Sequence, residues 1–145
     1  MPKTERREAK PPELSPDVAK ITDEAVEIRR DLHAHPELGF QEERTASVVA
    51  DRLNAIGLEG ATGVAKTGVV GLLRGGRPGT TVTVRADMDA LPVTEDTDLS
   101  FRSTLRTTYL GQDVGVMHAC GHDVHTAVQL GVASILKRSE ERRVG

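Results

Sequence analysis

The sequence has few aromatic residues, a single cysteine and no long apolar run. Its 145 residues include two phenylalanines, one tyrosine and no tryptophan, so a core must be built from aliphatic side chains. One cysteine excludes an internal disulfide and favours a reducing, cytoplasmic location. No apolar run approaches the length of a membrane span, and the first residues lack the apolar segment of a secretory signal. A formal net charge of −3 gives no basic footprint. We therefore expect neither a membrane nor a nucleic acid as partner.

Apolar residues spaced three and four apart predict three helices. The first spans residues 16 to about 34, begins with a proline at its first position, and is stopped by Pro36. The second spans residues 42–56, with Gly57 as its C-terminal cap. The third spans residues 122–137.

Between the second and third helices the pattern changes to short β-rich runs. We expect residues 69–74 and 80–86 to form two strands of one hairpin, joined by a glycine- and proline-rich turn. Residues 93–114 are polar and predict an irregular loop with a short turn. This order of elements indicates an α/β fold, with helices packed on a sheet, rather than a helical bundle.

The two ends of the chain differ in composition from the rest. Residues 1–16 are charged and proline-rich, which predicts a disordered N-terminal arm. Residues 138–145 read R-S-E-E-R-R-V-G, and one reverse translation resembles a short-read sequencing adapter read in frame. We therefore expect residues 17–137 to be the native folded part and residues 138–145 to be a non-native tail. Long-read resequencing of the source locus tests this, and a continuous native frame through these eight codons would contradict it.

The segment 117–126, M-H-A-C-G-H-D-V-H-T, carries the densest set of chemical groups. Cys120 and His122 offer a thiolate and an imidazole two residues apart, a pairing that Zn²⁺ and similar ions select. In a helix these two side chains would point apart, so Gly121 between them predicts a non-helical turn. Two ligands do not complete a zinc site, so further ligands must come from elsewhere.

The neighbouring polar residues have weaker assignments. Asp87 and Asp89 follow the strand expected over residues 80–86, where Asp89 could orient a metal-bound imidazole and either residue could simply stabilise a turn. Asp123 and His125 suit the start of the third helix. We expect His33 and His35, at a helix end, to be solvated or to stabilise the helix dipole rather than to bind a metal.

A thiol nucleophile is a competing interpretation of the same segment. Cys120 would attack a substrate with His118 or His122 as base. This chemistry also needs an oxyanion hole and a third, orienting group, and adjacent residues seldom form such a pair. The metal site is therefore favoured.

Three stretches, 29–40 (R-R-D-L-H-A-H-P-E-L-G-F), 85–92 (R-A-D-M-D-A-L-P) and 116–123 (V-M-H-A-C-G-H-D), occur in this order. Together they resemble the M20 metallopeptidase family, in the amidohydrolase branch of hippurate hydrolase, N-acyl-amino-acid deacylases and auxin-conjugate hydrolases. The resemblance covers residues 19–137 and implies the N-terminal part of a zinc-peptidase-like catalytic domain, in which helices pack on a mixed sheet, truncated before its end.

The resemblance implies a hydrolase of N-acyl amino acids that uses two divalent metal ions, zinc or manganese. Cys120 and His122 match two metal ligands, and Asp89 matches an aspartate that orients a ligand. His118, Asp123 and His125 are typical of the family and are expected to support the ligands. Asp87 falls where other branches place a histidine ligand, so no ligand role is expected for it here.

Several parts that the family uses are absent from the sequence. The paired glutamates, which supply the general base and a further ligand, are expected downstream of Lys137, as are later histidine ligands. A lid or dimerisation domain is also absent, and a homo-oligomeric full-length protein is compatible with the resemblance. We therefore expect this chain alone to be an inactive fragment. The alternative is a small structural metal-binding or interaction module without catalysis, in which Cys120, His122 and His125 hold the ion.

Overall fold

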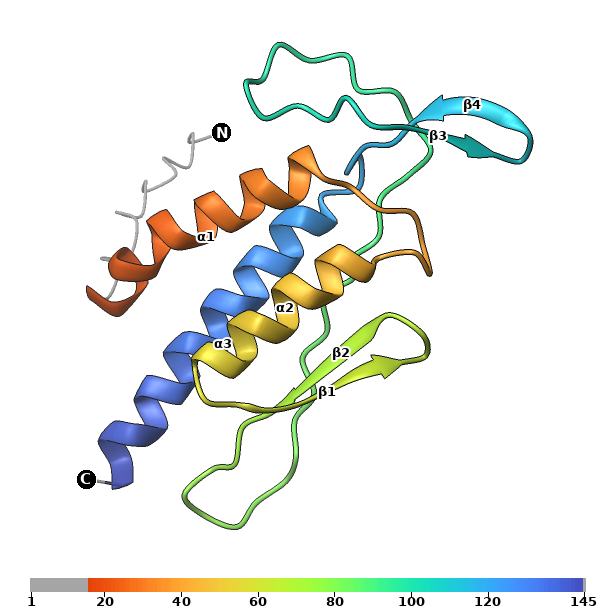
Figure 1. Ribbon diagram of the computed structural model, residues 1–145. Helices are drawn as coiled ribbons and strands as arrows, with labels where there is room; N and C mark the ends of the chain where they lie inside the picture. Colours follow the sequence, from red (N-terminus) through yellow and green to blue (C-terminus); the bar gives the residue numbers. More distant parts are fainter. Residues whose placement is uncertain (1–15, 145) are drawn as a thin grey trace, which may run out of the picture.

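The apolar stripes that the sequence predicts are the surfaces on which the helices pack. The computed structural model describes residues 16–144 and contains three helices: α1 (Pro16–Ala34), α2 (Glu43–Ala55) and α3 (His122–Val144). Figure 1 shows α1 and α2 lying along α3. The core between them is aliphatic, as the shortage of aromatic residues requires, and consists of Ile28, Leu32, Val49, Leu53, Leu58, Ala127 and Leu130.

Local signals set the helix ends much as the sequence predicts. Helix α1 begins at Pro16 and ends at Ala34, two residues before Pro36. At the end of α2, Gly57 has φ +71°, and its amide donates to the carbonyl of Asn54 while Leu58 donates to Leu53. This pair of hydrogen bonds is a Schellman motif, so the predicted glycine cap is confirmed.

The strands differ from the predicted hairpin. Strand β2 (Gly68–Leu72) pairs antiparallel with β1 (Glu59–Val64), a segment that the sequence did not suggest. Residues 80–86 form no strand: Val82 and Val84 are 80% and 56% exposed. The prediction of a hairpin between 69–74 and 80–86 is therefore wrong. A strand needs backbone partners, and the described residues supply none beside 80–86.

The expected irregular loop over residues 93–114 also contains regular structure. Strands β3 (Arg106–Tyr109) and β4 (Gln112–Gly115) form a second antiparallel pair. Leu110 and Gly111 connect them with φ +50° and +77°, the sign that a tight hairpin turn requires. The α/β class is confirmed, and within residues 16–144 both sheets are two-stranded.

The structure does not test the predictions made for the two ends of the chain. The predicted arm over residues 1–16 lies outside the described residues, except for Pro16, which begins α1. Helix α3 continues past Lys137 to Val144. The origin of residues 138–145 stays a prediction.

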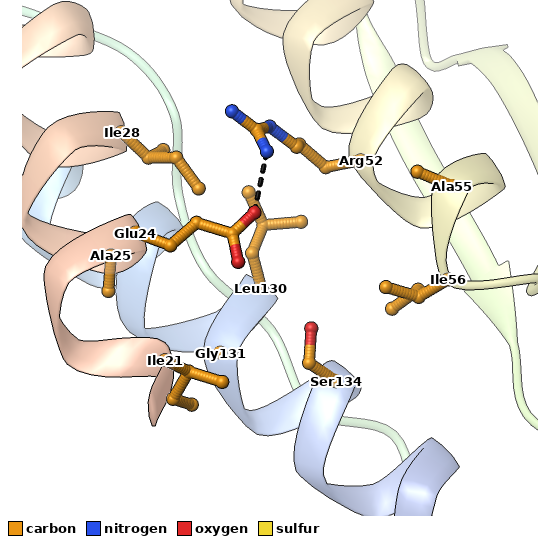
Figure 2. Close-up of a pocket in the computed structure, with 10 residues that line it drawn as sticks. All are labelled: Ile21, Glu24, Ala25, Ile28, Arg52, Ala55, Ile56, Leu130, Gly131 and Ser134. Carbon is orange, nitrogen blue, oxygen red and sulfur yellow. Dashed lines mark hydrogen bonds and ion pairs between the residues drawn. The ribbon is translucent and has the colours of Figure 1, made fainter. Parts of the chain in front are cut away.

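A groove lies where the three helices meet. Figure 2 shows Glu24 of α1 and Arg52 of α2 joined across it by a 2.5 Å ion pair. Its lining includes Ile21, Ile28 and Leu130, but none of the residues expected to bind a metal. Separately, no helix within residues 16–144 is long and apolar enough to cross a membrane.

Candidate metal centre

Short backbone bridges bring the three sequence motifs together. Leu38 pairs with Ala90 in a parallel bridge, and the amide of Ala90 donates to the carbonyl of Glu37 over 2.7 Å. Leu91 and Met117 exchange two hydrogen bonds of 2.9 and 3.0 Å in an antiparallel bridge. The segment around residues 90–91 therefore lies between the other two motifs. This arrangement places Asp89 near the start of α3.

Asp89 and His122 form the most defined contact of the site. The Nδ1 atom of His122 lies 3.0 Å from Oδ1 of Asp89 and 2.9 Å from the Asp89 carbonyl oxygen. Two acceptors at one nitrogen require that Nδ1 carries the hydrogen and donates it. The Nε2 lone pair of His122 is then available for a metal ion, as in carboxylate–histidine–metal arrangements.

Cys120 lies in the turn that precedes α3. Gly121 has φ +76°, and its carbonyl accepts from the amides of Val124 and His125 as the helix begins. The predicted non-helical turn is confirmed, and a side chain at position 121 would be strained. The Cys120 thiol is exposed and free, and it makes no hydrogen bond to any residue that the structure describes. It is therefore accessible to an ion.

His118 is buried without hydrogen-bond partners. The residue is 4% exposed, and neither ring nitrogen has a partner among residues 16–144. Burial lowers the pKa of His118, and the nearby Asp123 carboxylate opposes this only in part. The neutral imidazole is therefore the favoured form. A neutral ring needs less compensation in a buried position than an imidazolium would.

Asp123 and His125 occupy the first turn of α3, as expected, but on different sides. Asp123 is 1% exposed, and its Oδ2 atom accepts from Arg29 and contacts His33. His125 is exposed, and its ring centroid lies 5.7 Å from that of His122. Asp123 therefore faces helix α1, whereas His125 lies beside the candidate ligand.

Sequence reasoning missed the contacts that Arg29, His33 and Glu95 make in this region. His33, expected to be solvated, is buried with ring nitrogens 2.8 Å from Asp123 and 3.1 Å from Glu95. Arg29 lies one turn before it on α1. Spacing along α1 could have placed Arg29 and His33 on one face, but nothing local indicated that their partners come from residues 95 and 123.

The remaining candidates lie apart from these contacts. His35 is exposed and hydrogen-bonded to the carbonyl of Asp31, in agreement with a solvated helix end. Asp87 forms an ion pair with Arg85 and has no hydrogen bond or ion pair with Cys120 or His122.

The donor set suits part of a metal centre. A thiolate, an imidazole with a free Nε2 and an orienting carboxylate are groups that zinc-type ions use. Among residues 16–144, however, no three His, Cys, Asp or Glu side chains are grouped so that they could hold an ion. A closed structural site built from Cys120, His122 and His125 therefore has no support in this geometry.

Comparison with known proteins gives consistent matches. Residues 83–144 match the family model described as Peptidase family M20/M25/M40. The chain is 47% identical over 129 residues to thermostable carboxypeptidase 1 of Saccharolobus solfataricus, covering 88% of this chain and 31% of that protein. It is 45% identical over 121 residues to an N-acyl-L-amino acid amidohydrolase of Geobacillus stearothermophilus, covering 83% of this chain and 30% of that protein.

A solved structure agrees with these matches. The YXEP protein of Bacillus subtilis, described as a dinuclear metal binding peptidase from the M20 family, superposes with a TM-score of 0.75 at 38% identity. The match covers 84% of this chain and 32% of that one. The chain thus spans about a third of the length of the relatives that it matches. On the sequence match, the shared fold and the joined motifs, this chain belongs to the M20 peptidase family.

Proposed function

We propose that Cys120 and His122 are ligands in a two-metal centre of a protein that hydrolyses the amide bond of N-acyl amino acids. The observation that carries the proposal is the contact between His122 Nδ1 and Asp89, which leaves Nε2 free two residues from an exposed thiol. The dinuclear M20 neighbour and the amidohydrolase relative support the same reading.

The residues have separate parts in this proposal. Cys120 and His122 hold the ion, Asp89 fixes the tautomer and the direction of the His122 ring, and the buried residues His118 and Asp123 support the turn. Bound divalent cations of this kind polarise a carbonyl and lower the pKa of water. The general base, for which the family resemblance implies a glutamate, is not assigned to any residue of this chain. A single free thiol as ligand is also suited to the reducing cytoplasm.

Metal binding by the chain is the first test. Calorimetric titration of the 145-residue chain should detect Zn²⁺ or Mn²⁺ binding that Cys120→Ser and His122→Ala both abolish. His35→Ala, at an exposed histidine, is the matched control and should bind like the parent chain. We expect affinity weaker than micromolar, because no third ligand is grouped with Cys120 and His122 among residues 16–144. Binding that survives both substitutions would refute the ligand assignment.

Substrate turnover is the second test. We expect the chain alone not to hydrolyse hippurate or N-acetyl amino acids, because none of its residues is assigned as the catalytic base. A protein of the relatives' full length that carries this segment should hydrolyse them and lose turnover with Cys120→Ala. Peptides belong in the same assay because another relative is a carboxypeptidase. Preference for peptides over N-acyl amino acids would overturn the substrate class. Metal analysis of the active protein decides between zinc and manganese.

A further inference from the structure

A largely buried network of four ionisable side chains, Arg29, His33, Glu95 and Asp123, joins α1, α3 and the loop before β3. Its centre is His33, whose Nδ1 lies 2.8 Å from Asp123 Oδ2 and whose Nε2 lies 3.1 Å from Glu95 Oε1. Arg29 donates from Nε to the same Asp123 oxygen over 2.8 Å. The side chains of His33 and Glu95 are 4% and 0% exposed. The contacts therefore lie away from water, where such interactions are strong and costly to break.

The contacts of His33 are matched in hydrogen bonds, whereas Asp123 Oδ1 is buried without a hydrogen-bond partner among the described residues. Each ring nitrogen of His33 faces a carboxylate oxygen, so both contacts are hydrogen bonds when both nitrogens donate. The Arg29 guanidinium faces the Asp123 carboxylate, and the His33 ring bridges the carboxylates of Asp123 and Glu95. A buried arrangement of this kind specifies one geometry, because any displaced partner leaves an unpaired buried charge.

Glu95 also orders its own loop. Its Oε1 accepts from the Thr97 hydroxyl over 2.7 Å, and its Oε2 accepts from the Ser103 amide over 2.6 Å. The Glu95 carboxylate therefore links the two ends of the loop 95–103 and also contacts His33. The Phe101 ring, carried by the same loop, lies edge-on to His33 with centroids 5.6 Å apart.

The network reaches the candidate metal centre through adjacent residues of α3. Asp123, held by His33 and Arg29, directly follows His122, held by Asp89. The first turn of α3 is thus held at two places: His122 contacts Asp89, and Asp123 contacts helix α1. Because the turn with Cys120 leads directly into this helix start, the position of both candidate ligands depends on how firmly the turn is held.

We propose that Glu95 is a positioning residue for the candidate metal centre, acting through His33 and Asp123 on the ring of His122. The part that concerns metal affinity rests on the proposed function, whereas the part that concerns the His122 ring does not. Glu95→Gln preserves the size of the side chain but places an amide NH₂ where the carboxylate now accepts a hydrogen bond, because the Thr97 hydroxyl and the Ser103 amide donate to its two oxygens.

The test measures the His122 ring in the metal-free 145-residue chain. NMR reports solvent exchange of the His122 Nδ1 hydrogen, which the contact with Asp89 protects. Glu95→Gln should speed this exchange about tenfold and weaken Zn²⁺ binding by about the same factor, the low end for partners of metal ligands. Glu59→Gln is the matched control, since Glu59 forms an exposed ion pair with Arg74, and it should leave both values unchanged.

The outcomes separate the two proposals. Unchanged His122 exchange in a folded Glu95→Gln chain overturns the positioning role. Absence of Zn²⁺ binding by the parent chain overturns the ligand assignment, while the exchange comparison still decides the positioning role. If Glu95→Gln does not fold, Thr97→Val removes a single donor from the same carboxylate. It should then speed the exchange by a smaller factor, and no change would contradict the proposal.

Discussion

The imidazole of His122 is fixed by Asp89 through one ring nitrogen, Nδ1, which meets both the carboxylate and the carbonyl oxygen of that residue. The two residues are 33 positions apart, and the Leu91–Met117 bridge is what brings their segments together. The orientation of the candidate ligand therefore depends on strand-like pairing rather than on α3 alone.

Replacing the orienting carboxylate should weaken metal binding without unfolding the chain. We expect Asp89→Asn to reduce Zn²⁺ affinity by about 10- to 100-fold, because the neutral amide holds the ring less firmly and makes it a weaker base. Calorimetric titration measures the change. Asp87→Asn, the same substitution at an aspartate paired with Arg85, serves as control. Equal losses of Zn²⁺ affinity in the two variants would show that Asp89 does not orient the metal ligand.

Glu95 should make the stability of the chain depend on acid pH. Burial alone would raise the pKa of Glu95, but hydrogen bonds from Thr97, Ser103 and His33 outweigh it and lower the pKa below 4.5. The unfolded chain therefore takes up the proton first, so this stabilisation is present above pH 4.5 and is lost as pH falls through the lowered value.

Urea unfolding at pH 7, 5 and 3.5 tests this dependence. The free energy of unfolding of Glu95→Gln should lie below that of the parent chain at pH 7, and the difference should shrink at pH 3.5. Glu59→Gln should show a small difference that varies little with pH, because Glu59 is exposed. If the difference in free energy of unfolding between Glu95→Gln and the parent chain stays constant from pH 7 to pH 3.5, the pH-dependent stabilisation does not come from Glu95.

Two neighbouring positions of α3 should respond very differently to truncation. Leu130 is 5% exposed and belongs to the core, whereas Val128 is 55% exposed. Leu130→Ala should lower the free energy of unfolding by about 2–5 kcal/mol, and Val128→Ala by less than about 0.5 kcal/mol. Chemical unfolding followed by circular dichroism measures both, and similar losses would mean that α3 packs through another face.

Glu37 should stabilise the start of α2 from outside the helix. Its two carboxylate oxygens accept from the amides of Arg44 and Thr45 over 2.9 and 2.7 Å. Residue Glu42, at the N-cap position, makes no side-chain capping bond of its own. Glu37→Ala should therefore cost about 0.5–2 kcal/mol, as the loss of a capping side chain does. Glu27→Ala, on the exposed side of α1, is the control for the thermal melts. Equal melting temperatures for the two variants would exclude the capping role.

Local patterns along the chain determined the helices and named the candidate ligands. Spacing of Ile28, Leu32, Val49 and Leu53 predicts the buried faces, and Pro36 and Gly57 predict the ends, because these effects act within a few residues. Cys120, Gly121 and His122 likewise predict a turn with soft donors. β1 was missed because its sequence, E-G-A-T-G-V, has no apolar alternation, and because its turn uses Ala65 and Lys66 at positive φ, where glycine is usual.

Only the tertiary structure decided which partners surround those donors. That His122 meets Asp89, and that His33 is buried between Asp123 and Glu95, depends on contacts between residues 33 to 90 positions apart. It also decided that residues 80–86, with the alternation of a strand, form none here. Hydrogen bonds across such separations depend on how helices and bridges pack, which no local spacing encodes.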